Sequence, residues 1–119
     1  MWRRKSKYRA KRTADGFPSK LERAVYFKLK DREALGEISD IRRQHVVVLQ
    51  EGDKETRINW KIDFSFLDNK SGKRCFCEAK GVEDLSYKLK LKLFLKLKPG
   101  PIEIWKGSYV RPFLFKKYE

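Results

Sequence analysis

Three charged residues of one predicted β-hairpin have side chains suited to metal-dependent hydrolysis. Asp63 interrupts the apolar pattern of the first arm, whereas Glu78 and Lys80 lie near the end of the second arm. Carboxylate oxygens are the ligands that Mg²⁺ and Mn²⁺ prefer. A lysine two residues after Glu78 points to the same strand face, where it can orient or deprotonate a metal-bound water or stabilise a pentavalent phosphate.

The register of this hairpin decides whether the two carboxylates meet. We expect the connection DNKSGK to centre on Lys70 and Ser71, because this register brings together the apolar faces of the two arms. The same register places Asp63 directly opposite Glu78. Its predicted apolar pairs are Phe64 with Cys77 and Phe66 with Cys75.

Direct opposition of like charges, at about 5 Å between Cβ atoms, is destabilising unless something lies between them. Asp63 and Glu78 form one such predicted pair, and Lys61 and Lys80 form another. A divalent cation between the carboxylates would remove the first conflict. For each residue taken alone, a solvent-exposed strand with ordinary mixed charges is the alternative interpretation.

The elements that must carry these residues are predicted from periodicity. A helix is expected over PSKLERAVYFKLKDREALG, with Ser19 as its cap and Gly36 at its end. Strands are expected over residues 41–50, 56–67 and 74–80. The apolar stripe of the helix contains Leu21, Ala24, Val25, Leu29 and Leu35. The second strand is predicted to place on one face Ile58, Trp60, Ile62, Phe64 and Phe66.

The segment DLSYKLKLKLFLKLKPG alternates Lys and Leu as a strand would, yet its length and its ending at Pro99-Gly100 favour a crossover helix. PIEIW is then a strand returning parallel to the third one. Residues 106–119 form either an edge strand or a docked segment. The predicted fold is a small α/β domain with a mixed sheet, in the order α-β-β-β-α-β, over residues 17–119.

Composition points to a polyanionic partner. The chain of 119 residues has 30 Lys and Arg against 16 Asp and Glu, a net charge of +14, which favours DNA or RNA first and an anionic membrane surface second. Residues 1–16 are expected to form a basic flexible arm in which Trp2 and Tyr8 can stack on bases; a passive tail is the alternative. The basic residues of this arm are Arg3, Arg4, Lys5, Lys7, Arg9, Lys11 and Arg12.

The lysines of the predicted crossover helix form a second basic surface. Lys88, Lys92 and Lys96 recur every four residues and make one stripe, for which phosphate contact is expected. Lys90 falls within the leucine arc instead, where it either extends its amine to solvent or reaches the hydrolytic residues. A solvated helix face is the alternative for the stripe.

Several other classes are disfavoured. No apolar stretch follows the N-terminal charges, so a secretory signal is not expected and the cytoplasm is the predicted location; a basic organelle-targeting peptide is the alternative. Cys75 and Cys77 point to the same strand face, which makes a mutual disulfide sterically poor, and we expect both to be buried and reduced. With His45 as the only histidine, a zinc site is not expected.

KID followed after a hairpin by EAKG resembles the signature of the restriction-endonuclease-like PD-(D/E)XK nucleases. Asp63 matches the first half of that signature without its proline, and Glu78-Ala79-Lys80 matches the second half. SKLERAVYFKLK resembles the first helix of phage junction-resolving endonucleases and of small phage nuclease-like proteins. CEAKGVEDLSYKLKLKLFLKLKPGPIEIW resembles their segment from the active-site strand to the following strand. The resemblance spans residues 19–105.

The resemblance implies a Mg²⁺-dependent DNA endonuclease, phage-encoded and active in the host cytoplasm, that acts as a homodimer on branched DNA such as a Holliday junction. It further implies that Asp63, Glu78 and the backbone carbonyl of Ala79 are metal ligands, that Lys80 is the catalytic lysine and that Glu22 is an accessory acid. Ser19 and Glu22 also have the spacing of a helix capping box, which gives Glu22 an equal rival role.

Two rival functions remain open at this point. A non-catalytic DNA- or RNA-binding module would have the same basic charge, but it would have no use for the Asp63–Glu78 pair. A nuclease of the same fold could instead act on flaps, nicks or plain duplex.

Overall fold

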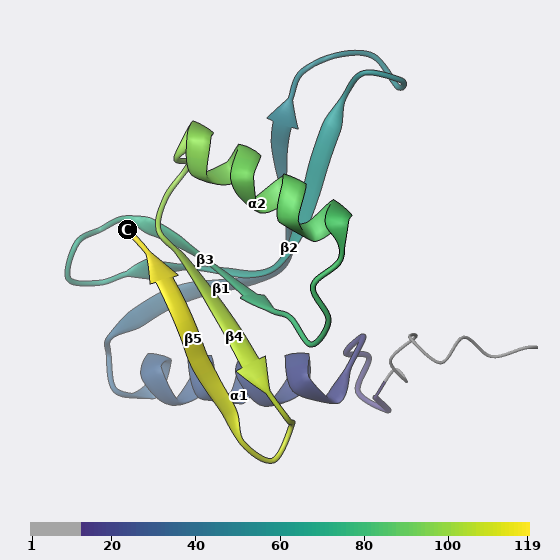
Figure 1. The fold of residues 1–119 in the computed structure, drawn as a ribbon. Coiled ribbons are helices and arrows are strands. Elements are labelled where there is room, and N and C mark those ends of the chain that lie inside the picture. Colours follow the sequence, from purple (N-terminus) through teal and green to yellow (C-terminus); the bar gives the residue numbers. More distant parts are fainter. Residues whose placement is uncertain (1–12) are drawn as a thin grey trace, which may run out of the picture.

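The order of helices and strands follows the predicted one, with a fifth strand added at the C-terminus (Figure 1). A computed structural model of the chain describes residues 13–119. Its elements are α1 (Lys20–Ala34), β1 (Ile38–Gln50), β2 (Ile58–Asp68), β3 (Arg74–Ala79), α2 (Leu85–Leu97), β4 (Ile102–Gly107) and β5 (Pro112–Tyr118). The strands form one five-stranded mixed sheet in the order β1-β2-β3-β4-β5.

The crossover through α2 is the feature that makes the sheet mixed. β3 and β4 pair in parallel, and α2 connects them, as the length of the Lys/Leu segment predicted. The other neighbouring strands pair antiparallel. Of the two alternatives for the C-terminal segment, the edge strand is confirmed, because β5 pairs only with β4.

Helix α1 begins and ends where its local sequence predicts. The Ser19 hydroxyl accepts a hydrogen bond from the backbone N–H of Glu22 at 3.1 Å. At the other end Gly36 has a φ of 78°, and Gly36 N–H and Glu37 N–H return to the carbonyls of Glu33 and Arg32, both at 3.0 Å. Such a left-handed ending favours glycine, because an L side chain is strained there.

Thr13 to Gly16, which the sequence assigns to the basic arm, make a hydrogen-bonded turn on this helix. Thr13 N–H donates to the Phe17 carbonyl at 2.8 Å, and the Asp15 carboxylate pairs with the Arg23 guanidinium at 2.7 Å. The rest of the predicted arm, including Trp2 and Tyr8, lies outside the described residues.

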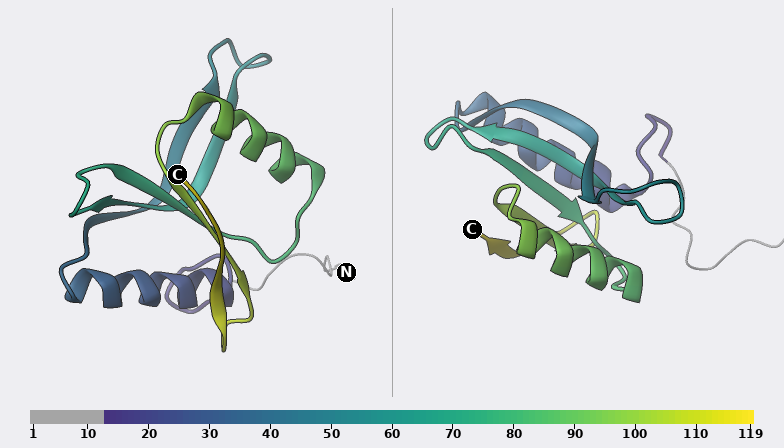
Figure 2. Two further views of the ribbon diagram at one scale, coloured as in Figure 1. Left: turned by 60° about the vertical axis from the view of Figure 1, so that its left-hand side comes forward. Right: turned by 90° about the horizontal axis from the view of Figure 1, so that it is seen from above.

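The two helices cover opposite faces of the sheet, and each closes its own apolar core (Figure 2). The core beneath α1 contains Val25, Leu29, Phe64, Phe66, Cys75 and Cys77. The core beneath α2 contains Trp60, Ile62, Phe76, Tyr87, Phe94, Ile102 and Ile104. Both cysteines are buried and unbridged, as predicted.

The prediction that one face of the second strand carries all its alternating apolar residues is wrong. Trp60 and Ile62 pack beneath α2, whereas Phe64 and Phe66 pack beneath α1. Strict alternation would keep all four on one face. The strand therefore changes face at Asp63, which is the residue that the sequence singles out for chemistry.

No helix among residues 13–119 is both long enough and apolar enough to cross a membrane.

Candidate active site

Strands β2 and β3 separate at the predicted carboxylate pair. The expected pairs Phe64 with Cys77 and Phe66 with Cys75 are confirmed, and Phe64 with Cys77 is the last pair of the ladder in that direction. Beyond it, Asp63 N–H donates to Glu78 Oε1 at 3.1 Å, and Ala79 N–H donates to Asp63 Oδ2 at 2.8 Å. Each carboxylate thus replaces a backbone acceptor of the opposite strand.

This exchange corrects two details of the predicted register. Asp63 and Glu78 do not form a ladder pair, because their side chains occupy the space where backbone hydrogen bonds would continue. The predicted pair of Lys61 and Lys80 does not form either, because the β2–β3 ladder ends at Phe64 and Cys77. Lys61 pairs with Val46 of β1, and Lys80 N–H donates to the Trp105 carbonyl of β4 at 2.9 Å.

Glu22 supplies a third carboxyl group to the place where the strands separate. It lies in the first turn of α1, is only 3% exposed, and its Oε1 accepts a hydrogen bond from Gln44 Nε2 at 3.3 Å. Its Oε2 is buried without a hydrogen-bond partner among the described residues. Only half of the predicted capping box is therefore present: Ser19 caps the helix, while the Glu22 carboxyl turns towards Gln44 and Asp63.

The three carboxyl groups strongly resist carrying three negative charges at once. Burial first, and then the neighbouring Asp63 carboxyl, raise the pKa of Glu22 to about 9, against the effect of the Gln44 hydrogen bond. Burial also raises the pKa of Asp63 to about 7 and raises the pKa of Glu78. A protonated Glu22 can donate to Asp63, which gives Oε2 a partner that a carboxylate there lacks. The cluster therefore needs either protons or a cation.

Lys80 is held beside this cluster from the other side. Its ammonium lies 5.1 Å from the centre of the Tyr87 ring, in cation–π contact with the first turn of α2. Its positive charge lowers the pKa of Glu78, against the effect of burial. The charges of Glu78 and Lys80 therefore interact, although β3 ends at Ala79 and Lys80, predicted as the last residue of the third strand, follows it.

The donor set suits a hard divalent cation in its chemistry. One oxygen of each carboxyl is committed to a protein N–H, namely Glu22 Oε1, Asp63 Oδ2 and Glu78 Oε1. The Asp63 carboxyl also lies within hydrogen-bonding reach of the Glu22 and Glu78 carboxyls, and among residues 13–119 Glu22 Oε2 is a buried oxygen without a hydrogen-bond partner. Within residues 13–119, however, no three His, Cys, Asp or Glu side chains are already disposed as a metal site.

Two residues of this site carry no sequence signal of their own. Gln44 lies within an ordinary strand pattern, and Tyr87 falls on the core face of α2. Gln44 is positioned by its backbone dihedral angles, and Tyr87 is positioned by the packing of α2 on the sheet. The periodicity of the sequence indicates neither. Finding Gln44 would have required knowing that its φ is 55°, a left-handed value that glutamine rarely adopts.

The predicted phosphate-binding lysines divide into two groups. Lys88, Lys92 and Lys96 are exposed on α2, whereas Lys90 is half-buried. The hydrogen bond from the Tyr87 N–H lowers the pKa of Asp84 at the start of the helix, and the charges of Lys80 and Lys90 contribute less. The arm residues Arg3, Arg4, Lys5, Lys7, Arg9, Lys11 and Arg12 lie outside the described part of the chain.

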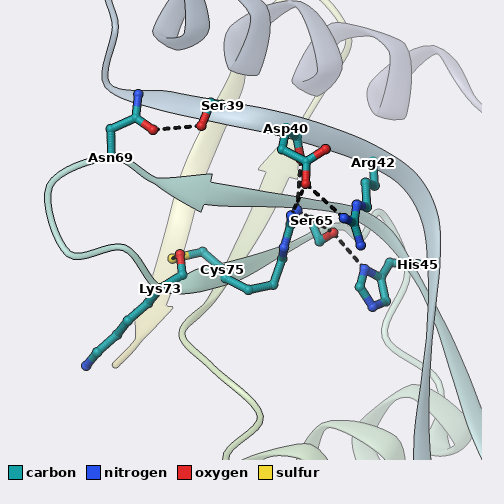
Figure 3. Close-up of polar contacts among 9 residues, drawn as sticks. Ser39, Asp40, Arg42, His45, Ser65, Asn69, Lys73 and Cys75 are labelled. Atoms are coloured by element: carbon teal, nitrogen blue, oxygen red, sulfur yellow. Dashed lines mark hydrogen bonds and ion pairs between the residues drawn. The ribbon is translucent and has the colours of Figure 1, made fainter.

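A second polar cluster, around His45, stabilises the sheet (Figure 3). His45 Nδ1 lies 2.7 Å from the hydroxyl of Ser65, which is fully buried, and Arg74 donates to that hydroxyl at 3.2 Å. Arg74 also donates to the Asp40 carbonyl at 2.8 Å. Burial, and then the charges of Arg74 and Arg42, lower the pKa of His45. With no access to Ser65 from solvent, this cluster joins β1, β2 and β3 and is no nucleophilic site.

Comparison with known proteins gives one match. The family described as protein of unknown function, DUF1064, matches residues 5–105, which is most of the chain. No curated protein and no solved structure matches it.

Proposed function

The chain belongs to the DUF1064 family, and we propose that it is a divalent-metal-dependent DNA endonuclease of the restriction-endonuclease-like type. The observation that carries the proposal is the buried Glu22 Oε2, which lies beside two further carboxyl groups and has no hydrogen-bond partner within residues 13–119. A buried polar atom of this kind is costly unless something binds it. A Mg²⁺ or Mn²⁺ ion would bind it together with the carboxyl groups of Asp63 and Glu78 and would take the place of the protons that these groups otherwise share.

Each residue has a role in this proposal. Asp63, Glu78 and Glu22, with the Ala79 carbonyl, would hold the ion, which when bound supplies charge stabilisation for phosphodiester hydrolysis. Lys80 would orient the attacking water or stabilise the negative charge that develops on the phosphate. The Lys80 ammonium is held in contact with the Tyr87 ring, and this keeps its positive charge close to the Glu78 carboxyl group.

The substrate assignment rests on charge. A net charge of +14 favours a polyanion, and the exposed lysine stripe Lys88, Lys92 and Lys96 lies on the helix that begins next to Lys80. We extend the proposal to branched DNA, to a homodimer and to the cytoplasm, because the sequence resembles phage junction-resolving endonucleases over residues 19–105. Flaps, nicks and duplex are the alternative substrates of the same chemistry.

A non-catalytic nucleic-acid-binding module is the second candidate, and one observation favours it. Asp63 and Glu78 both bond to backbone N–H groups, so they have a structural role even without a metal ion. In that case bound protons, and not a metal ion, would neutralise the three carboxyl groups. Metal-dependent cleavage separates the two candidates, because the module has none.

The decisive experiment incubates labelled four-way junction, flap and duplex DNA with the protein, with Mg²⁺ or with EDTA. The proposal expects cleavage only with the cation, and none by Glu78→Gln. Glu55→Gln is the matched control, because Glu55 is an exposed acid of the β1–β2 loop. Cleavage by Glu78→Gln at the rate of wild type would refute the assignment of the site.

A further inference from the structure

We propose that Gln44 is a positioning residue of the carboxyl site: its backbone turns β1 over beside Asp63, and its amide fixes Glu22 with one oxygen left for a ligand. As far as that ligand is a metal ion, the inference rests on the proposed function. Gln44 binds neither the ion nor the DNA in this view. It acts through Glu22.

The backbone of Gln44 is the first part of the argument. In the β1–β2 ladder, Arg43 pairs with Phe64 and His45 pairs with Ile62, but between them Gln44 and Asp63 form no pair. Gln44 has a φ of 55° at this step. A left-handed residue other than glycine is uncommon in a strand, and it persists only where the surrounding structure holds it.

The side chains on either side of Gln44 show what this backbone does. The Arg43 guanidinium lies 3.8 Å from the centre of the Phe17 ring, in the core beneath α1. The His45 ring lies 5.2 Å from that of Phe76, in the core beneath α2. Residues two apart in a regular strand share a face, so β1 turns over at Gln44. β2 changes face at the facing residue, Asp63, and both strands therefore bend at the site.

The amide of Gln44 is the second part. Its Nε2 donates to Glu22 Oε1 at 3.3 Å, and in the part of the chain that the structure describes Glu22 Oε2 is left buried without a hydrogen-bond partner. A neutral donor suits this role better than Lys or Arg, because it fixes the carboxyl without bringing a positive charge that would compete with a cation. The left-handed backbone directs the glutamine side chain towards α1, where its amide reaches Glu22. Backbone and amide therefore both position Glu22.

Gln44→Asn tests the amide with little change to the backbone. Asparagine tolerates the left-handed region, but its amide is one methylene shorter and falls short of Glu22. Gln50→Asn is the matched control, since Gln50 lies on the same strand and its Nε2 donates to the Thr56 carbonyl, away from the site. Gln44→Gly, which permits the same φ and removes the amide, is the second variant.

The first measurement needs no metal. Urea unfolding of wild type, Gln44→Asn, Glu22→Ala and the double variant in EDTA gives a double-mutant cycle. If Gln44 positions Glu22, the change in midpoint caused by Gln44→Asn is lost or reversed once Glu22 is absent. Additive changes would overturn the inference. The same cycle with Gln44→Gly is expected to give the same coupling.

The second measurement is the Mn²⁺ dissociation constant by titration calorimetry, with Mn²⁺ alone and no DNA. Loss of an outer partner of a ligand typically weakens metal binding 10- to 100-fold, and this is expected for Gln44→Asn but not for Gln50→Asn. An affinity of Gln44→Asn equal to that of wild type would overturn the inference. A wild-type protein that takes up no Mn²⁺ would refute the proposed function, and the metal-free cycle would then alone decide the role of Gln44.

Discussion

Replacing the buried acid of α1 by its neutral isostere, Glu22→Gln, is expected to stabilise the metal-free protein at alkaline pH. Burial and the neighbouring Asp63 raise the pKa of Glu22 from 4.5 to about 9 in the folded state. The folded protein therefore holds a proton there that the unfolded chain releases. Stability is full below the unfolded pKa and falls as the pH rises from about 4.5 to about 9.

The size of the effect follows from the shift. One pKa unit corresponds to about 1.4 kcal/mol, so a shift of this size sets an upper bound of roughly 6 kcal/mol on the loss in free energy of unfolding that Glu22 causes between low and high pH. Proton sharing between Glu22 and Asp63 reduces this, and we expect a few kcal/mol. Asp63, whose pKa rises from 3.8 to about 7, adds a loss of the same sign at lower pH.

The assay is urea unfolding of wild type and Glu22→Gln at pH 5, 7 and 9 in EDTA. At pH 5 the two proteins should have similar stability, because Glu22 is then protonated and a glutamine amide can donate to Asp63 in its place. At pH 9 the variant should be more stable. Glu33→Gln on the same helix is the control, since Glu33 makes only a surface ion pair with Lys30.

Other groups with raised pKa values act in the same direction as Glu22, but they are present in both proteins and so do not produce the difference between them. These groups are Glu78, Cys75 and Cys77, each with a raised pKa. The pKa of His45 is lowered, so its contribution rises with pH, with the opposite sign, and it is common to both proteins. The surface carboxyls of Asp40 and Asp53 have lowered pKa values, so they change the stability of the fold only at acidic pH. Equal stability of wild type at pH 5 and pH 9, or a Glu22→Gln variant that is less stable at pH 9, would refute the reasoning.

Three further outcomes are expected. Asp63→Asn, Glu78→Gln and Lys80→Ala should each reduce cleavage by orders of magnitude with DNA binding retained in gel-shift assays; full activity in any of them would remove that residue from the site. Tyr87→Phe should keep near-normal cleavage and Tyr87→Leu should lose it at matched DNA affinity, whereas equal loss would assign the role to the hydroxyl. Deleting residues 1–12 should flatten the dependence of log affinity on log salt by several units, and an unchanged slope would make the arm a passive tail.

Local sequence signals account for most of the fold. The Ser19 cap, Gly36 and the Pro99-Gly100 ending mark the limits of the two helices, and each works over a few residues. The register of β2 and β3 follows from the match of Phe64 with Cys77, because a slip of one residue would expose the buried side. The first strand begins at Ile38, three residues before the predicted residue 41. Asp40, which like Gln44 has a left-handed backbone, interrupts the alternation of apolar and polar side chains near the start of this strand.

The sequence predicts only those residues of the candidate site whose positions follow from regular strand spacing. Asp63, Glu78 and Lys80 were found from two neighbouring strands, whose spacing is regular and therefore calculable. Glu22 came from the resemblance alone, because nothing in the pattern of α1 says which strand residue its first turn will meet. Gln44 could not be found, because its role depends on a φ of 55° that no periodicity encodes.

The face change and the site have a common cause. A regular β2 would direct Ile62 and Phe64 to one core and Asp63 to the opposite face, beneath one helix only. The turn at Gln44 allows Ile62 to pack beneath α2 and Phe64 to pack beneath α1. Asp63 therefore lies at the point where β2 passes from one core to the other. From there it contacts Glu22 of α1 and, through its backbone N–H, Glu78 of β3. Left-handed backbone at a non-glycine residue costs about 1–3 kcal/mol, and the protein accepts this cost at the step where three carboxyl groups must meet.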